Sequence, residues 1–178
     1  MAFLVKTGRQ PAAGPSTPGY AVVNQWIHVA RPTLTLPQTA SNQLFLVKGG
    51  RVLVHALIGE VTVAIQSSDP VAKVRASRLN AAMDTIVGTT YDVASTLDMS
   101  SDEIGTIYTV EGDGTAIDSP QLAGSGRLGG SKWIMPNGEI ILTTGASKTG
   151  EIKWDLWYQP LDEGAYVSAV VTAVVAVG

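Results

Sequence analysis

One glycine-rich run has the spacing of a dinucleotide-binding loop. Gly124, Gly126 and Gly129 match the pattern G-x-G-x-x-G, which lets backbone amides approach a pyrophosphate at the start of a helix. That chemistry needs a buried strand before the loop and a helix after it. The pattern of residues 119–133 contains neither element. We therefore interpret the run as a plain glycine loop and predict no nucleotide cofactor.

Two histidines are the only imidazole groups in the chain, and there is no cysteine. His28 lies in an alternating strand pattern, and His55 is expected to share a strand face with Leu53 and Leu57. A zinc site or a nucleophile-base triad would need further groups around one of these histidines. No G-x-S-x-G elbow accompanies either one. The sequence predicts structural histidines, no metal site and no cofactor, and it nominates no catalytic residue at either histidine.

Acidic residues cluster at one glycine-containing turn. Glu111, Asp113 and Asp118 lie around Gly112 and Gly114, and their oxygens could bind calcium weakly. The D-x-[DN]-x-[DN]-G pattern with a distal Glu is missing, so turn chemistry is the simpler interpretation. The paired carboxylates of glycoside hydrolysis need only be close in space. That chemistry therefore stays open at the level of sequence.

The composition predicts one sheet-rich domain without nucleic-acid or membrane partners. The chain has 178 residues, of which 45% are hydrophobic and 6% aromatic, and this length usually forms a single core. The net charge of −3 argues against a phosphate-binding surface. The longest apolar run, residues 165–178, is shorter than the roughly 20 residues that a membrane-spanning helix needs.

The first 19 residues are predicted to form an extended arm and linker. Residues 8–19 contain three prolines and three glycines, which prevent a helix or a strand ladder from running through them. Phe3, Leu4 and Val5 precede this linker as a short apolar segment that cannot bury itself alone. The remaining residues, 20–178, are predicted to form a single β-sandwich domain.

Short apolar or alternating runs bounded by turn residues predict about ten strands and no helix longer than two turns. We expect Gly49-Gly50 and Asn137-Gly138 to close hairpins, the second through a type I′ turn. Arg31-Pro32 is expected to end the first strand. The fold class is therefore all-β, an antiparallel sandwich or a jelly roll. The predicted strands are residues 20–30, 44–48, 51–58, 61–66, 72–79, 104–110, 132–136, 139–143, 151–159 and 166–177.

Aromatic residues and charges are both unevenly distributed. Alternation places Trp154 and Tyr158 on the buried side of their strand and leaves Trp157 on the polar side, as an interface anchor or a ligand platform. Residues 1–79 carry a net charge of +6, and residues 80–126 carry −8. Solvated loops explain this asymmetry, and so does a protomer with oppositely charged sides that docks against its own copies.

The segment from Asn137 to Val170 reads N-G-E-I-I-L-T, then a turn, then T-G-E-I-K-W-D-L-W-Y-Q-P-L-D-E-G-A-Y-V. It resembles the closing part of small β-rich virion proteins of tailed bacteriophages, especially capsid decoration or cement proteins. The proline-rich arm is similar to arms that reach neighbouring subunits. This resemblance implies a non-enzymatic protein, made in the host cytoplasm, that binds the major capsid protein on the outside of the virion. It also implies a homo-oligomer, commonly a trimer, that stabilises the capsid.

Two other functions stay open. One is a carbohydrate-binding or receptor-binding module, such as a fibre tip, which requires exposed coplanar aromatic rings near Asp, Asn or Arg side chains. The other is a glycan-cleaving sandwich enzyme, which requires two carboxylates in a groove. For the decoration function, the candidate contact residues are Phe3, Leu4 and Val5 on the arm and Trp157 on the body.

Overall fold

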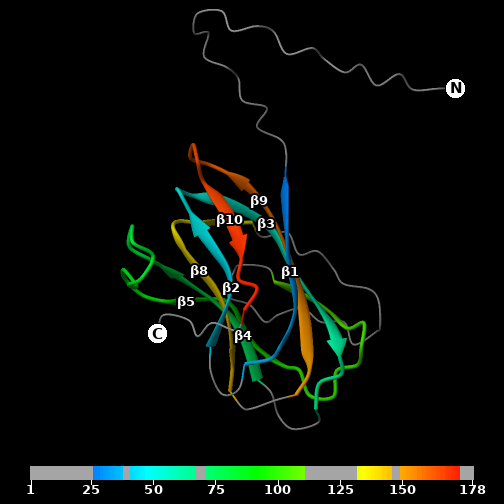
Figure 1. The fold of residues 1–178 in the computed structure, drawn as a ribbon. Helices are drawn as coiled ribbons and strands as arrows, with labels where there is room; N and C mark the ends of the chain where they lie inside the picture. The colour runs from blue at the N-terminus through cyan, green and yellow to red at the C-terminus, as the bar shows by residue number, and fades with distance from the viewer. Residues whose placement is uncertain (1–25, 38–40, 67–70, 111–131, 146–148, 173–178) are drawn as a thin grey trace, which may run out of the picture.

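A computed structural model describes residues 26–37, 41–66, 71–110, 132–145 and 149–172. Across these ranges the protein is all-β: ten strands form two antiparallel sheets packed face to face (Figure 1). None of the described residues lies in a helix, and none therefore belongs to a helix long and apolar enough to cross a bilayer. The predicted arm and linker lie outside the described residues.

The first sheet has the order β1-β9-β3-β6, and β7 pairs with the same edge of β3 as β6. The second sheet has the order β10-β2-β8-β4-β5. The bounds in the first sheet are β1 Ile27–Thr35, β3 Val52–Val63, β6 Ile107–Val110, β7 Trp133–Met135 and β9 Glu151–Pro160. Those in the second are β2 Ser41–Lys48, β4 Val71–Arg78, β5 Tyr91–Asp98, β8 Gly138–Thr144 and β10 Tyr166–Ala169.

Side-chain alternation places the core between the sheets. In β9, Ile152, Trp154, Leu156 and Tyr158 all face inward and are at most 3% exposed, which confirms the predicted burial of Trp154 and Tyr158. The Trp154 ring covers Gly59 of β3, where a Cβ would lie only 3.0 Å from the ring atoms. The Trp154 ring of β9 therefore occupies the space that a side chain at residue 59 of β3 would need.

The central strand of the second sheet, β8, is buried on both faces. Ile140 and Leu142 belong to the core, whereas Glu139 and Ile141 are buried on the opposite face. Gln43 of β2 donates a hydrogen bond from Nε2 to Glu139 Oε2 at 2.6 Å. A hydrogen-bonded carboxylate can stay buried where an unpartnered one would be costly.

The strands on either side of the two predicted glycine turns do not pair with each other, which corrects the hairpin prediction for both turns. Gly49-Gly50 carries the chain from β2 in the second sheet to β3 in the first, and residues 136–137 carry it from β7 in the first to β8 in the second. Among the described strands, only β4 and β5 are both consecutive and paired. Most strands match the predicted ranges because burial pattern is local. Strand β5 was not predicted, and the predicted strands 51–58 and 61–66 form one continuous strand, β3. The partners of the strands lie far away in sequence.

Asn137 and Gly138 do not form a type I′ turn, because neither has a positive φ angle. Asn137 accepts two hydrogen bonds, one from the Gly50 amide to Oδ1 at 2.8 Å and one from the Leu79 amide to its carbonyl at 3.0 Å. Gly138 faces the Ser77 carbonyl so closely that a Cβ would lie 2.1 Å from the oxygen. Glycine is needed here for close approach of two strands rather than for a left-handed conformation.

Strand β1 continues through Arg31-Pro32 to Thr35, contrary to the predicted stop. The register shifts between Arg31 and Leu34, and a proline is tolerated at such a bulge on an edge strand. Arg31 is only 2% exposed and donates to the carbonyls of Val170 at 2.9 Å and Gln43 at 3.4 Å. Desolvation lowers its pKa to about 10, so the guanidinium stays charged at neutral pH and links the two sheets.

The oppositely charged parts of the sequence meet inside the second sheet. Asp92 of β5 forms ion pairs with Lys73 at 3.3 Å and Arg75 at 3.2 Å, both on the adjacent strand β4. Asp92 therefore offsets part of the positive charge of β4.

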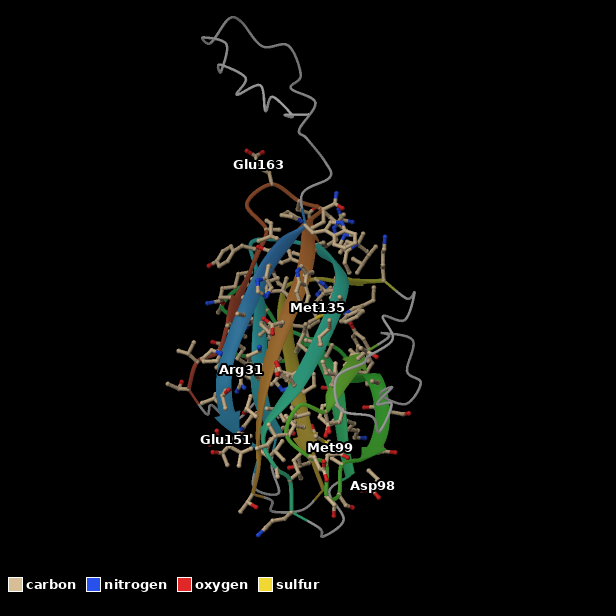
Figure 2. All side chains as sticks on the ribbon, turned by 90° about the vertical axis from the view of Figure 1, so that its right-hand side faces the viewer. Arg31, Asp98, Met99, Met135, Glu151 and Glu163 are labelled. Carbon is tan, nitrogen blue, oxygen red and sulfur yellow. The ribbon has the colours of Figure 1, made fainter. Side chains whose placement is uncertain are left out.

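Asp98 and Met99 lie at the end of the sandwich opposite to Glu163 (Figure 2).

Candidate functional site

Four aromatic side chains form a surface on the solvent-facing side of the first sheet, the sheet nearest the viewer in Figure 2. They form two stacked pairs. Trp26 and His55 have ring centroids 4.4 Å apart and planes inclined by 26°, and His28 and Trp157 are 4.6 Å apart and inclined by 19°. We call Trp26, His28, His55 and Trp157 the aromatic surface.

Strand register brings these residues together from distant parts of the chain. His28 of β1 pairs with Trp157 of β9, which in turn pairs with Ala56 of β3. The β3–β9 register shifts between Val54 and Ala56, so His55 is the extra residue of a β-bulge. A bulge re-aims a side chain, and here it lets His55 and Ala56 lie on the same face.

The bulge also corrects the predicted environment of His55. The sequence pattern placed Leu57 on the same face as His55, but Leu57 is 1% exposed and belongs to the core. The extra residue reverses the alternation for the rest of the strand. His55 therefore shares its outward face with Ala56 and Ile58 rather than with Leu57, and no local sequence pattern indicated its contact with Trp26.

A groove of about 230 Å³ lies within the aromatic surface. Trp26 and Trp157 line it together with Ala56 and Ile58, and its lining is almost entirely apolar. Trp26 is 57% exposed, while Trp157 is half-buried. An exposed tryptophan beside an apolar hollow is typical of a binding surface rather than of a folded core.

Charged and polar groups surround the groove but do not line it. His28 Nε2 lies 2.7 Å from Asp155 Oδ1, and Lys153 forms ion pairs with Glu60 at 3.0 Å and Asp155 at 3.7 Å. The Lys132 ammonium lies 5.9 Å from the centroid of the Trp26 ring, within the range of a cation–π interaction. The site is thus an apolar centre with a polar rim, the usual anatomy of a protein interface.

His55 is expected to be neutral at pH 7. Burial lowers its pKa below the ordinary 6.5, the Gln159 side chain acts in the opposite direction by accepting a hydrogen bond from the ring, and the charge of Lys132 lowers the pKa further. The folded state then binds fewer protons than the unfolded state, so the free energy of unfolding falls as the pH drops below 6.5. An NMR titration should place the His55 midpoint below 6.5, and Lys132→Ala should raise it. A midpoint at or above 6.5 would contradict this environment.

A larger cavity, about 480 Å³, lies between the strand connections near Arg51, Arg78 and Asn137. Its polar groups already serve the fold. Arg51 and Asp162 form a two-pronged ion pair with distances of 2.9 and 2.7 Å, which lowers the pKa of Asp162 to about 2, and Asn137 is engaged as described above. We therefore treat this cavity as a junction of loops.

The predicted site residues are placed only in part. Trp157 lies in the aromatic surface, whereas Phe3, Leu4 and Val5 lie outside the described residues, as do the glycine run and the acidic turn at residues 111–118. Within the ranges that the structure describes, no three His, Asp or Glu side chains are grouped to hold a metal ion. Sequence reasoning missed Trp26, because its partner His55 becomes its neighbour only through strand pairing.

Comparisons with known proteins leave this site to be interpreted from its own geometry. No protein-family model, no curated protein and no solved structure matches the chain.

Proposed function

We propose that this chain is a structural protein of a tailed-bacteriophage virion, a capsid decoration protein that assembles into a homo-oligomer and binds the outer capsid surface. The observation that carries the proposal is the groove between Trp26 and Trp157. Its volume of about 230 Å³ is below the roughly 300–1,000 Å³ of small-molecule sites. It fits one apolar side chain of a protein partner, and tryptophans in such settings are typical interface anchors.

The strand order supports a jelly roll as the finer description of the fold. With β7 and β10 set aside as additions, the eight remaining strands have the orders β1-β9-β3-β6 and β2-β8-β4-β5. These are the two four-stranded sheets expected when a pair of Greek keys is wrapped into a jelly roll. Viral capsid domains and lectins are built in this way, so the fold is compatible with both candidate functions.

A decoration protein stabilises a capsid by linkage, because a ligand that binds only the assembled shell shifts the equilibrium toward that shell. The three-fold positions of a capsid present equivalent sites, and a trimer would engage three of them at once and gain avidity. A rigid sandwich with an apolar surface suits this role. The resemblance of residues 137–170 to phage decoration proteins, noted above, supports the same assignment.

The test is co-sedimentation of the purified chain with expanded capsids, assembled from the major capsid protein encoded in the same phage genome. Saturable binding at a fixed ratio to the capsid protein, and a higher temperature of capsid disruption, are the expected results. Deletion of residues 1–9 should reduce binding at least tenfold. Failure of the full chain to sediment with either expanded or unexpanded capsids would refute the proposal.

A carbohydrate-binding module is the second candidate, favoured by the proximity of Asp155 and Gln159 to the tryptophans of the aromatic surface. The groove lining argues against it, because sugar hydroxyl groups buried against apolar atoms lose hydrogen bonds to water without replacement. A glycan-array signal that disappears in Trp157→Ala would favour this candidate over the decoration function.

A further inference from the structure

We propose that the groove between Trp26 and Trp157 binds the apolar segment Phe3–Val5 of a second copy of this chain. The inference rests on the proposed oligomeric function and names the contact that builds the oligomer. It makes the arm and the aromatic surface two halves of one interface, with one of each in every subunit.

The groove selects an apolar occupant. Its lining is almost free of polar atoms, so a polar ligand would lose hydrogen bonds to water on entering. An aromatic or branched apolar side chain gains roughly 25 cal/mol of favourable free energy for each Å² that it buries, and it also contacts the faces of two tryptophans. Phe3 and Leu4 are side chains of this kind, and Ala2–Val5 is an apolar run without a polar residue.

The starting point of the arm supports this occupant. The described chain begins at Trp26, and Trp26 itself lines the groove. Twenty residues, 6–25, separate Val5 from Trp26. The arm is therefore joined to the body at a residue of the groove. If the grooves are the contact sites between subunits, each arm is joined to its subunit at such a contact.

The length of the linker is sufficient for it to reach a groove on a neighbouring subunit. Pro11, Pro15 and Pro18 occur within the linker, and proline-rich segments extend by about 3.1 Å per residue. Twenty such residues reach roughly 60 Å, whereas a domain of this size is about 40 Å across. Residues 6–25 are therefore long enough for Phe3 to reach the groove of an adjacent subunit.

The exchange has a definite symmetry. An arm that binds a groove is a heterologous contact, which closes into a ring when each subunit passes its arm to the next. In a ring of three subunits, every arm is bound in the groove of the next subunit and no groove is left empty. The lack of cysteine in the chain allows this arrangement to be tested by disulfide trapping without background.

The experiment introduces one cysteine on the arm and one on the groove floor, Leu4→Cys with Ala56→Cys, in the full chain. Mild oxidation should give covalent dimers and trimers on non-reducing gels, at least tenfold more than in the matched control Leu4→Cys with Val171→Cys. Val171 is 60% exposed, so the control has the more accessible cysteine. Only intramolecular disulfide, or no excess over the control, would overturn the proposal.

Mass measurement in solution gives an independent check. The full chain should be oligomeric, and Phe3→Ser with Leu4→Ser should be monomeric with an unchanged thermal unfolding curve. An unchanged mass in this variant would overturn the proposal. Capsid binding by a variant that forms no trapped oligomers would refute the arm exchange alone, whereas trapped oligomers that fail to bind capsids would refute the decoration function alone.

Discussion

Gly138→Ala is expected to remove most of the stability of the protein. The added Cβ would lie 2.1 Å from the Ser77 carbonyl oxygen, which belongs to the backbone of β4 and cannot rotate away. Relief requires β4 and β8, the inner strands of the second sheet, to separate at the end of their pairing, where Arg78 pairs with Gly138. We expect a loss of about 4 kcal/mol or more, in the range of the most damaging substitutions, measured by urea denaturation.

Gly164→Ala is the matched control. Gly164 has a φ angle of +79°, and its added Cβ would meet nothing within 4 Å. The cost is then only that of a left-handed residue, about 1–2 kcal/mol. Equal losses in the two variants would show that backbone conformation, and not the contact with Ser77, determines the effect at residue 138.

Trp154→Ala is expected to have the next largest effect, a loss of about 3–5 kcal/mol. Trp154 is 1% exposed, and its ring fills the space left by Gly59. Truncation leaves a cavity between β9 and β3 at the centre of the first sheet, and no side chain at residue 59 can move to fill it. Chemical denaturation measures this loss directly.

Trp157→Ala, on the other face of the same strand, provides the comparison. Its ring is half-buried and stacks on His28, an arrangement worth about 0.5–1.5 kcal/mol. We expect a loss near 1 kcal/mol together with loss of self-association. A cost as large as that of Trp154→Ala would mean that the aromatic surface is a structural element and not an interaction site.

Much of the fold could be predicted from the sequence because strand burial is local. The alternation from Glu151 to Gln159 identified the inward tryptophan and tyrosine, since side chains on a strand alternate between faces. The partners of each strand could not be predicted in the same way. Gly49-Gly50 and Asn137-Gly138 have the composition of hairpin turns, yet both connect different sheets, because glycine also permits close backbone approach.

The candidate site was accessible only in part, for a related reason. Trp157 stood out because it interrupts a polar face, but Trp26 and His55 have no local signal. Their contact depends on the pairing of β1 with β9 and of β9 with β3, and on the bulge at His55. A bulge adds one residue and reverses every subsequent face, so residues 56–58 could not be assigned correctly from periodicity.

The position of β9 also determines when the chain can fold during synthesis. β9 lies between β1 and β3 in the first sheet, but its residues, Glu151–Pro160, leave the ribosome long after those of β1 and β3. Until they emerge, β1 and β3 have no strand between them, and their apolar faces remain exposed to chaperones and to other nascent chains. Folds dominated by such distant pairings form slowly. Efficient production of this protein therefore depends on keeping the partly synthesised chain soluble until β9 has been translated.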